Sequence, residues 1–420
     1  MPRTLVNPDP TPHERADDTP PTGRGIAGFH PNVIALGATS FLTDLSTEML
    51  IPVMPLFVTA TLGASLASLG LIEGVAEATA SLLRLVSGRI ADVPARRKPL
   101  VVAGYSLSGL CKTAMAAASV WPVLLALRFG DRVGKALRNP PRDALLADSS
   151  SDADLGRTFG LHRAMDTLGA AAGPLVAWVL LRQWSELGAE GYRRIFLVSA
   201  IPALLAVLVL VRFVRPPVPR RAAAVATPDR TPFGGAFRRF VAADVLFQLG
   251  NSSTAFLLLR AERSGFSAGD VALVYLGYNL IAALLALPFG GLSDRVGRRP
   301  LLMTGYLLYT LAYGVAACAP TRAGVAIAFA VLAVHTALVD GQARSLVADL
   351  VPRARRSSAF GTYHAAVGLA LLPASLIAGQ LWQRVGGAAP FAFGACCALA
   401  AAIAFTWLLP AHHEAEARRA

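Results

Sequence analysis

Charged residues are scarce in this sequence, where they occupy 15% of 420 positions. Soluble globular domains carry about 25%, so the composition argues against an ordinary soluble fold. Apolar segments of about 20 residues, the length that crosses a bilayer as a helix, recur along almost the whole chain. Because a spanning segment must satisfy its backbone hydrogen bonds internally, we predict an all-α membrane protein. The twelve expected spans are 32–59, 66–88, 99–119, 121–142, 158–181, 194–213, 239–260, 270–291, 300–319, 323–346, 360–382 and 388–410.

Cysteine is scarce as well, and recognisable catalytic motifs are missing. All four cysteines fall inside predicted spans, which predicts apolar packing residues and no disulfide framework. They are Cys111, Cys318, Cys396 and Cys397. Outside the spans the sequence has no nucleotide-binding loop, metal-ligand cluster or nucleophile–base signature, so we expect neither an enzyme nor a bound cofactor or metal. The closing segment "AHHEAEARRA" contains His412 and His413, and the sequence leaves open whether this pair binds a metal.

Acidic residues are outnumbered, since 39 Lys and Arg against 26 Asp and Glu leave a net charge of +13. The basic residues lie in alternate connections between spans, whereas opposite connections such as "ATLGAS" and "ASVWP" carry no charge. This distribution follows the positive-inside rule and is not typical of a nucleic-acid-binding surface. We predict a multi-pass protein of the cytoplasmic (inner) membrane with both termini in the cytoplasm. Residues 1–29 lack an apolar signal core and are expected to form a disordered cytoplasmic tail.

An internal repeat divides the chain. The segment "RKPLVVAGYSL" at 97–107 matches "RRPLLMTGYLL" at 298–308 at an offset of 201, and the same offset relates Asp148 to Asp349. We therefore predict two pseudo-symmetric six-helix bundles joined by a cytoplasmic linker. The predicted ranges are 30–213 and 238–410 for the bundles, 214–237 for the linker and 411–420 for a C-terminal tail. Parallel halves with a site between them near the membrane midplane are typical of one class of secondary transporter.

The loop "GGLSDRVGRR" at Gly290–Arg299 meets every position of the pattern G-x-x-x-D-R-x-G-R-R. It resembles the signature loop between helices 8 and 9 of the major facilitator superfamily. The matching loop "GRIADVPARRK" is degraded, because Val93 and Ala95 replace a basic residue and a glycine. The resemblance covers essentially all twelve spans and implies a monomeric transporter that works by alternating access, with a latch between its halves at these loops. The latch residues that it implies are Gly88, Asp92, Gly290, Asp294, Arg295, Gly297 and Arg298.

Ionisable residues inside the spans are the main functional signal. A charge at bilayer depth costs at least about 2.5–3.5 kcal/mol, so it needs a partner or a wet cavity. Acidic residues four positions apart occur in the first two spans, and basic residues in the third and fourth stand at a similar depth. We predict a cavity of paired acids and bases near the midplane. The predicted substrate- and proton-binding residues are Asp44, Glu48, Glu73, Glu77, Lys112, Arg128, Asp131, Arg132, Asn251, Tyr275, Asn279, His335 and Asp340.

The second half is expected to contribute mostly neutral groups. Tyr275 and Asn279 stand where the first half has Glu73 and Glu77, at an offset of 202. In this half we expect only His335 and Asp340, both in the tenth span, to be titratable, so the first half is expected to carry the ionic chemistry.

Two further motifs resemble the superfamily. "RFGDRVGK" resembles the helix-4 signature R-x-x-Q-G-x-G, with Asp131 for the glutamine and Arg132 for the first glycine. In the family the arginine, here Arg128, is associated with proton transfer. "GAAAGPLVAW" in helix 5 resembles the G-x-x-x-G-P motif of the family's antiporters and implies close helix packing at Gly169, Gly173 and Pro174. This motif favours export over import.

These observations predict a proton-coupled secondary transporter, an exporter of a small molecule or cation driven by the proton gradient, with the lipid bilayer and its substrate as partners. Three alternatives stay open. The basic residues could bind an organic or inorganic anion that is imported with protons. The charged residues could form structural ion pairs only, or the chain could be a sensor or scaffold that keeps the fold without transport.

Overall fold

The computed structural model describes residues 28–91, 94–150, 154–215, 232–352 and 355–408, so most of the predicted tails and linker lies outside it. The described residues form helices and no β-strand, in agreement with the predicted all-α membrane fold. In the first half the helices are α1 (Pro31–Glu48), α2 (Met54–Leu56), η2 (Phe57–Thr61), α3 (Leu66–Ala91), α4 (Pro94–Met115), α5 (Trp121–Asp148), α6 (Leu155–Gln183), η4 (Ser185–Leu187) and α7 (Ala189–Phe213). In the second half they are α8 (Gly235–Gly250), α9 (Thr254–Arg263), α10 (Ala268–Val296), α11 (Arg298–Cys318), α12 (Arg322–Asp349), α13 (Arg356–Arg384) and α14 (Ala389–Leu408).

Among the residues that the structure describes, eight helices are long and apolar enough to cross a membrane, namely α3, α6, α7 and α10 to α14. The helices α4 and α5 supply two more of the predicted spans, and α5 is rich in charge. The remaining two spans are discontinuous, since α1 continues through α2 and η2, and α8 continues through α9. The predicted count of twelve spans is therefore consistent with the structure.

The two discontinuous spans break at equivalent places in the repeat. Residues 49–53 separate α1 from α2, and at the offset of 201 they correspond to 250–254, where α8 gives way to α9. Pro52 and Pro55 lie at the first break and cannot donate backbone hydrogen bonds to a continuous helix. At the second break the hydroxyl of Ser253 accepts from the backbone N–H of Ala255 and caps α9. Discontinuous helices of this kind line the central sites of many transporters.

Two ion pairs are also related by the repeat. The guanidinium of Arg97 at the start of α4 contacts the carboxylate of Asp148 at the end of α5. At the same offset, Arg298 at the start of α11 contacts Asp349 at the end of α12. The sequence repeat is therefore a repeat of tertiary contacts as well.

The halves contact each other mainly through α3 with α13 and α6 with α10, and also through α2 with α9. Glycine permits the closest approach. A Cβ atom on Gly70 of α3 would lie 2.3 Å from the carbonyl oxygen of Ser375, and one on Gly379 of α13 would lie 2.5 Å from that of Leu66. Because these neighbours are backbone atoms, the two helices cannot meet this closely with larger residues at these positions.

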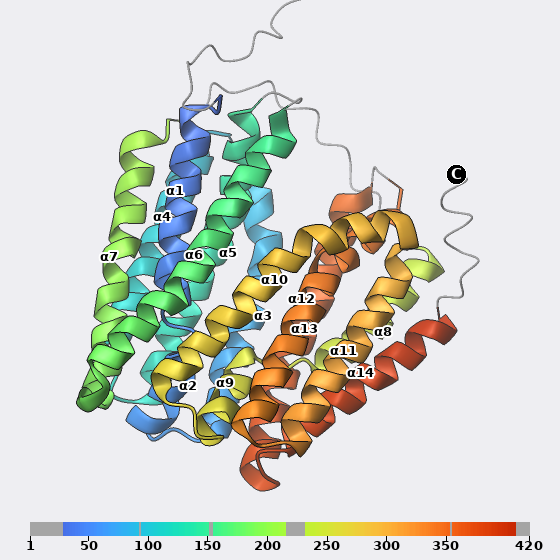
Figure 1. The fold of residues 1–420 in the computed structure, drawn as a ribbon. Helices are drawn as coiled ribbons and strands as arrows, with labels where there is room; N and C mark the ends of the chain where they lie inside the picture. Colours follow the sequence, from blue (N-terminus) through green and yellow to red (C-terminus); the bar gives the residue numbers. More distant parts are fainter. Residues whose placement is uncertain (1–27, 92–93, 151–153, 216–231, 353–354, 409–420) are drawn as a thin grey trace, which may run out of the picture.

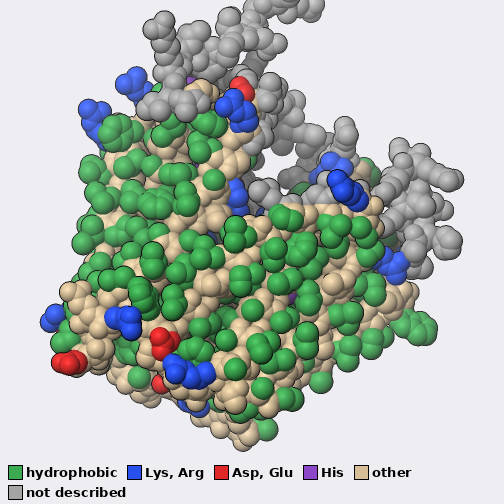
Figure 2. Space-filling model, in the orientation of Figure 1, with side chains coloured by type: hydrophobic (Ala, Val, Ile, Leu, Met, Phe, Trp, Pro, Cys, Tyr) green, Lys and Arg blue, Asp and Glu red, His purple; other side chains and the backbone are tan. Residues whose placement is uncertain are grey.

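The halves separate toward one end of the molecule. We call the end at which α1 begins and α7 ends the linker end, and the end that holds α2 and α9 the opposite end. The two bundles converge at the opposite end and splay apart toward the linker end (Figure 1). Figure 2 shows the surface hollowed between the halves at the linker end, with basic side chains beside the hollow. The structure is thus closed at the opposite end and open toward the linker end.

Candidate functional site

The two acids of α1 lie where α6 packs most closely on that helix. A Cβ atom on Gly169 would lie 3.0 Å from the Cβ of Asp44, and one on Gly173 would lie 2.6 Å from the Cβ of Glu48. The G-x-x-x-G-P motif of α6 therefore packs directly on the segment of α1 that carries both carboxylates. Glu48 is also the last residue of α1, so its side chain projects at the break in the first span.

Lys112 of α4 is buried beside α1. Only 1% of its surface is exposed, and its ammonium donates to Ser46 Oγ at 3.1 Å and to Thr47 Oγ1 at 2.9 Å. One turn earlier on α4, Ser108 donates a 2.5 Å hydrogen bond to Oδ1 of Asp131. Lys112 and Asp131 also interact electrostatically. The cation and the acid thus each have hydroxyl partners, which are Ser46 and Thr47 for Lys112 and Ser108 for Asp131.

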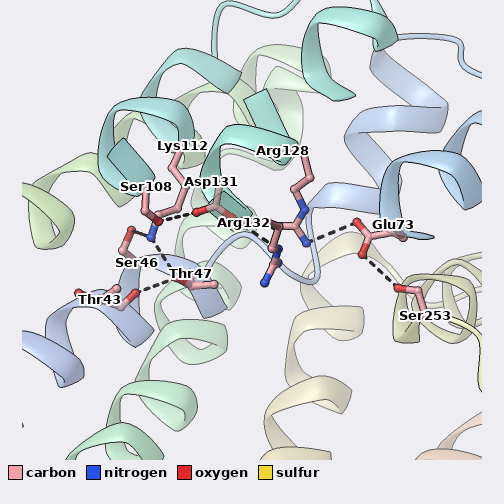
Figure 3. Close-up of polar contacts among 10 residues, drawn as sticks. All are labelled: Thr43, Ser46, Thr47, Glu73, Ser108, Lys112, Arg128, Asp131, Arg132 and Ser253. Atoms are coloured by element: carbon pink, nitrogen blue, oxygen red, sulfur yellow. Dashed lines mark hydrogen bonds and ion pairs between the residues drawn. The ribbon is translucent and has the colours of Figure 1, made fainter. Parts of the chain in front are cut away.

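Asp131 lies between two arginines of its own helix. Its Oδ2 is 3.7 Å from Arg128 Nη1 and 3.7 Å from Arg132 Nε. Arg128 then contacts Glu73 of α3, with 3.4 Å between Nη2 and Oε1. All four side chains are at least nine-tenths buried. Figure 3 shows the resulting row of polar groups, which runs from α1 through α4 and α5 to α3.

Two acids of the first half accept hydrogen bonds from hydroxyl groups of the second half. The hydroxyl of Ser253, at the start of α9, donates to Glu73 Oε2 at 3.1 Å (Figure 3). The hydroxyl of Tyr275 on α10 donates to Glu48 Oε2 at 3.0 Å. Asn279, one turn further along α10, donates to the backbone carbonyl of Ala170 at 3.2 Å. The ionic site therefore borders the interface between the halves.

The basic residues continue along α5 toward the linker end. Glu77 interacts electrostatically with Arg132 and Lys135, and Asp44 interacts with Lys135 and Arg138. The Arg138 guanidinium lies 4.4 Å from the centre of the Tyr105 ring. Several buried donors of this row find no acceptor among the described protein atoms, and these are Arg128 Nε, Arg132 Nε, Arg138 Nε and Arg138 Nη1. Buried polar groups are normally satisfied, so these donors mark a place where a ligand could bind.

Other predicted residues lie away from this row. Asn251 bonds within its own half, donating to Gln248 Oε1 at 2.8 Å and accepting from the hydroxyl of Tyr309 at 3.3 Å. The Nδ1 of His335 lies 2.7 Å from the Gly305 carbonyl oxygen, and its ring stands against Phe247 and Tyr309. The side chain of Asp340 lies outside the described part of the structure.

The predicted latch is described only in part. Asp92 and the side chains around Gly88 and Asp294 lie outside the described residues, and Arg295 is exposed. Gly297 joins α10 to α11 with φ +92°, a conformation that favours glycine. No atom lies within 4 Å of a Cβ atom placed on Gly290. Arg298 contacts Asp349 and the Ser345 carbonyl oxygen, both within its own half.

Sequence reasoning missed a buried carboxylate in the second half. Asp244 of α8 is 1% exposed and is bonded by hydroxyl groups of Tyr306 and Tyr363. The expectation that His335 and Asp340 were the titratable residues to consider in this half was therefore incomplete. The available signal was a single acid inside the apolar run "FVAADVLFQLG", which itself contains no basic residue.

In the part of the chain that the structure describes, no group of three or more His, Cys, Asp or Glu side chains is arranged to hold a metal ion. The ionisable groups of the first half instead form pairs of opposite charge, which can hold protons or an ionic ligand.

Comparisons with known proteins agree with this architecture. The Major Facilitator Superfamily model matches residues 36–259 and 240–420. An uncharacterized MFS-type transporter of Methanocaldococcus jannaschii, MJ1317, is 32% identical over 376 residues, which cover 88% of this chain and 92% of that protein. The uncharacterized protein Rv2265 of Mycobacterium tuberculosis is 29% identical over 368 residues, covering 86% of this chain and 85% of that protein.

Solved structures show the same fold at low sequence identity. A variant of the nucleoside transporter NupG superposes with a TM-score of 0.77 at 16% identity, covering 90% of this chain and 99% of that one. A D-xylose-proton symporter superposes with a TM-score of 0.71 at 17% identity, covering 91% of this chain and 98% of that one. The match to the family model and the identity to MJ1317, together with the repeated six-span halves, confirm the resemblance found in the signature loops. The chain is a membrane transporter, not an enzyme, and it belongs to the Major Facilitator Superfamily.

Proposed function

We propose that the protein is a proton-coupled exporter, which exchanges protons for a small molecule or cation across the cytoplasmic membrane by alternating access. It acts as a monomer, with the proton gradient as its driving force. Asp44, Glu48, Glu73 and Glu77 bind protons and substrate in turn. Arg128 and Asp131 form the coupling pair, and Tyr275 and Asn279 contribute neutral hydrogen bonds.

The observation that carries this proposal is the contact of two acids of the first half with hydroxyl groups of the second half. Glu48 and Glu73 accept hydrogen bonds from Tyr275 and Ser253 across the interface. A hydrogen bond to an ionised carboxylate is about twice as strong as one between neutral groups. Protonation or substrate binding at these acids therefore weakens a contact between the halves, which is the change that a coupled transporter needs.

The membrane orientation in this proposal rests on the basic residues. Arg97, Arg212 and Arg298 lie at the linker end, where α4 and α11 begin and α7 ends. The positive-inside rule assigns this end to the cytoplasm. The structure is then open toward the cytoplasm, the conformation from which an exporter takes its substrate.

The direction of transport rests on helix α6. Its G-x-x-x-G-P motif resembles that of the superfamily's antiporters, and Gly169 and Gly173 bring α6 against the two acids of α1. Substitution at either glycine would displace the carboxylates that bind the proton. This arrangement supports antiport at the acids of α1.

A second candidate, the import of an anion with protons, is favoured by arginine N–H groups that form no hydrogen bond in the described part of the structure. Arg128, Arg132 and Arg138 each hold at least one buried N–H without an acceptor in the described protein. Guanidinium groups bind carboxylates and phosphates well, because their donors match the geometry of these anions. In this alternative the acids only relay protons.

A thermal-stability screen of the purified protein separates the two candidates. Divalent metals, organic cations, carboxylates and phosphates are tested at mildly acidic and mildly alkaline pH, since a ligand at 100 times its Kd stabilises by about 2.7 kcal/mol. Stabilisation by a cation that is stronger at alkaline pH and lost in Glu48→Gln supports exchange with protons. Stabilisation by an anion that is lost in Arg128→Ala supports the alternative and contradicts the cation exporter.

The compound that stabilises the protein is then tested for transport in proteoliposomes. An imposed pH gradient should drive its accumulation in wild-type vesicles and not in vesicles with Glu48→Gln. Glu190→Gln is the matched control, because Glu190 is exposed at the start of α7 and pairs only with Arg194 in the described structure. Counterflow without any response to the pH gradient would contradict proton coupling, and the absence of counterflow would favour a sensor or scaffold.

A further inference from the structure

The second half contains a buried carboxylate whose described neighbours are all neutral. Oδ1 of Asp244 accepts a 2.7 Å hydrogen bond from the hydroxyl of Tyr306 on α11. Oδ2 accepts from the hydroxyl of Tyr363 on α13 at 3.1 Å and from Nε2 of Gln248 at 3.4 Å. Three helices therefore converge on a single acid that is 1% exposed.

This setting differs from that of the acids in the first half. Glu73 and Asp131 each have an arginine within 4.0 Å, whereas no basic side chain of the described residues lies that close to Asp244. The titratable groups that face it are the hydroxyls of Tyr306 and Tyr363. The helix α14, which also packs on α8, contributes no Asp, Glu, Lys, Arg or His.

Two histidines lie in the surrounding shell. His364 follows Tyr363 on α13, and the ring of His335 stands against Phe247, which stacks on Tyr306. Neither histidine forms an ion pair with Asp244 in the described structure. Cys397 of α14 lies near Gly250, at the far end of α8 from the linker. The acid is therefore surrounded by hydroxyl, amide and aromatic groups.

A carboxylate in such a place can exist in two protonation states. Burial without a cation penalises the ionised form by several kcal/mol, whereas three hydrogen-bond donors stabilise it. A tyrosine hydroxyl can donate to an ionised carboxylate or accept from a protonated one, so the same three residues accommodate both states. The contacts of Asp244 therefore allow a proton to bind to the carboxylate and to leave it reversibly.

We propose that Asp244 forms a second proton-binding site of the transporter, located in the second half and bonded by Tyr306 and Tyr363. Its occupant is a proton and not a metal cation, because two of its three partners are hydroxyl donors that already point at the carboxylate. On binding, the proton adds to one carboxylate oxygen, and the adjacent tyrosine hydroxyl turns from donor to acceptor.

Tyr363 connects this site to the interface. It lies on α13, and about one and a half turns further along that helix Gly368 packs on Ser81 of α3, with only 2.2 Å between a Cβ placed on Gly368 and the Cβ of Ser81. A change in the hydrogen bond of Tyr363 therefore acts on the helix that contacts the first half most extensively. This coupling role rests on the proposed proton-driven function, whereas proton binding at Asp244 does not.

Infrared difference spectroscopy of the full-length protein tests the proposal without any substrate. The C=O stretch of a protonated carboxyl group is followed as pH is varied, in wild type and in Asp244→Asn. We expect one pH-dependent carboxyl band of the wild type to be lost in the variant. Asp143→Asn is the control, because Asp143 is about half exposed and pairs with Arg142 at the linker end, so it should leave that band unchanged.

Conservative variants keep the test decisive if Asp244→Asn does not fold. Tyr306→Phe and Tyr363→Phe retain the carboxyl group and remove one hydrogen bond, so each should shift the frequency of the same band. Identical pH-dependent spectra in wild type and in all the Asp244, Tyr306 and Tyr363 variants would overturn the proposal. A band displaced by sodium at constant pH would also overturn it, since the occupant would then be a metal cation.

Transport assays separate this proposal from the main one. If the band titrates and is lost in Asp244→Asn while no pH gradient drives transport, the proton site stands and the proposed coupling fails. If a pH gradient drives transport while Asp244 shows no titration, the proposed function stands and the second proton site is wrong.

Discussion

The hydroxyl of Tyr275 donates a 3.0 Å hydrogen bond to Oε2 of Glu48, which joins α10 of the second half to α1 of the first. The bond lies at the break of the first span, where Glu48 ends α1. On a third helix, α6, Gly173 packs against the Cβ of Glu48 and restricts the positions that the carboxylate can occupy. The charge state of one acid is thereby linked to the contact between the halves.

The first prediction concerns this bond. Tyr275→Phe should lower the thermal stability of the purified protein by about 1.5–3 kcal/mol at alkaline pH, because it removes a hydrogen bond to a charged group. The effect should shrink as pH falls and Glu48 becomes protonated. Differential scanning fluorimetry at several pH values measures both the loss of stability and its dependence on pH.

A double-mutant cycle with Glu48→Gln isolates the pair. We expect the combined effect to differ from the sum of the single effects by about 0.5–3 kcal/mol, as for residues in direct contact. Tyr192→Phe on α7 serves as the control tyrosine. Simple additivity of Tyr275→Phe and Glu48→Gln would show that the contact does not contribute in the purified protein.

The second prediction concerns Glu73, which contacts Arg128 and Ser253 at once. Glu73→Gln should be strongly destabilising, by about 3–5 kcal/mol, because it leaves a buried arginine with a weaker set of partners. Ser253→Ala should cost only about 1 kcal/mol but should increase labelling of cysteines placed at the opposite end, since it removes one bond between the halves.

Ser264→Ala is the matched control for this change. Its hydroxyl bonds only to the carbonyl of Arg260 in its own helix, so its loss should leave labelling at the opposite end unchanged. Equal labelling of the Ser253→Ala and Ser264→Ala variants would remove Ser253 from the contact that holds the halves together.

The third prediction is charge compensation between Lys112 and Asp131. Lys112→Met should destabilise the protein, because Asp131 loses the attraction of one of its three positive neighbours and two hydroxyl acceptors lose their donor. Adding Asp131→Asn to Lys112→Met removes one charge of each sign and is expected to change stability by less than the sum of the two single variants. Thermal melting of the four proteins provides the comparison.

Lys98→Met is the control for removal of a lysine, since Lys98 lies at the linker end and donates to the carbonyls of Val211 and Val214. Combining Lys98→Met with Asp131→Asn should give additive effects, because these residues are not neighbours. The same additivity for Lys112 and Asp131 would contradict their coupling.

The fourth prediction concerns the contact between α3 and α13. Gly70→Ala places a Cβ 2.3 Å from the carbonyl oxygen of Ser375, so the helices must move apart. We expect a loss of about 1–3 kcal/mol in stability, as for overpacking of a well-packed core, together with greater access to the opposite end. Cysteine labelling at the start of α3 reports this access.

Gly314→Ala on α11 is the matched substitution, because no atom outside the helix lies within 4 Å of its added Cβ. It should change neither labelling nor stability appreciably. Should Gly70→Ala behave in the same way, the close contact of α3 and α13 would not hold this conformation closed.

Several features of the site could be predicted because they follow from local chemistry. Asp44, Glu48 and Glu73 stand out in apolar spans, where an unpaired charge is too costly to occur without a purpose. The repeat at an offset of 201 could likewise be read from matching segments, and it anticipated the equivalent positions of Arg97 and Arg298. The breaks after Glu48 and Gly250 were not predicted, since the apolar runs continue across both.

Partners across the interface could not be predicted from spacing. Ser253 and Glu73 are 180 positions apart and meet only because the second half docks on the first. Asp244 was missed for a related reason, since its partners Tyr306 and Tyr363 lie on other helices, 62 and 119 residues along the chain. A lone acid in an apolar run carries no sign of the hydroxyl groups that will surround it.

The sequence by itself determined that the chain crosses the membrane many times, that its halves repeat, and that its first half holds acids and bases at membrane depth. These properties depend on hydropathy, length and charge, which act along a single segment. Only the tertiary structure decided which acid faces which base, which hydroxyls reach across the interface, and which end of the molecule is open. Those outcomes depend on how closely helices distant in sequence approach, and at Gly70 and Gly173 the close approach is possible because glycine has no side chain.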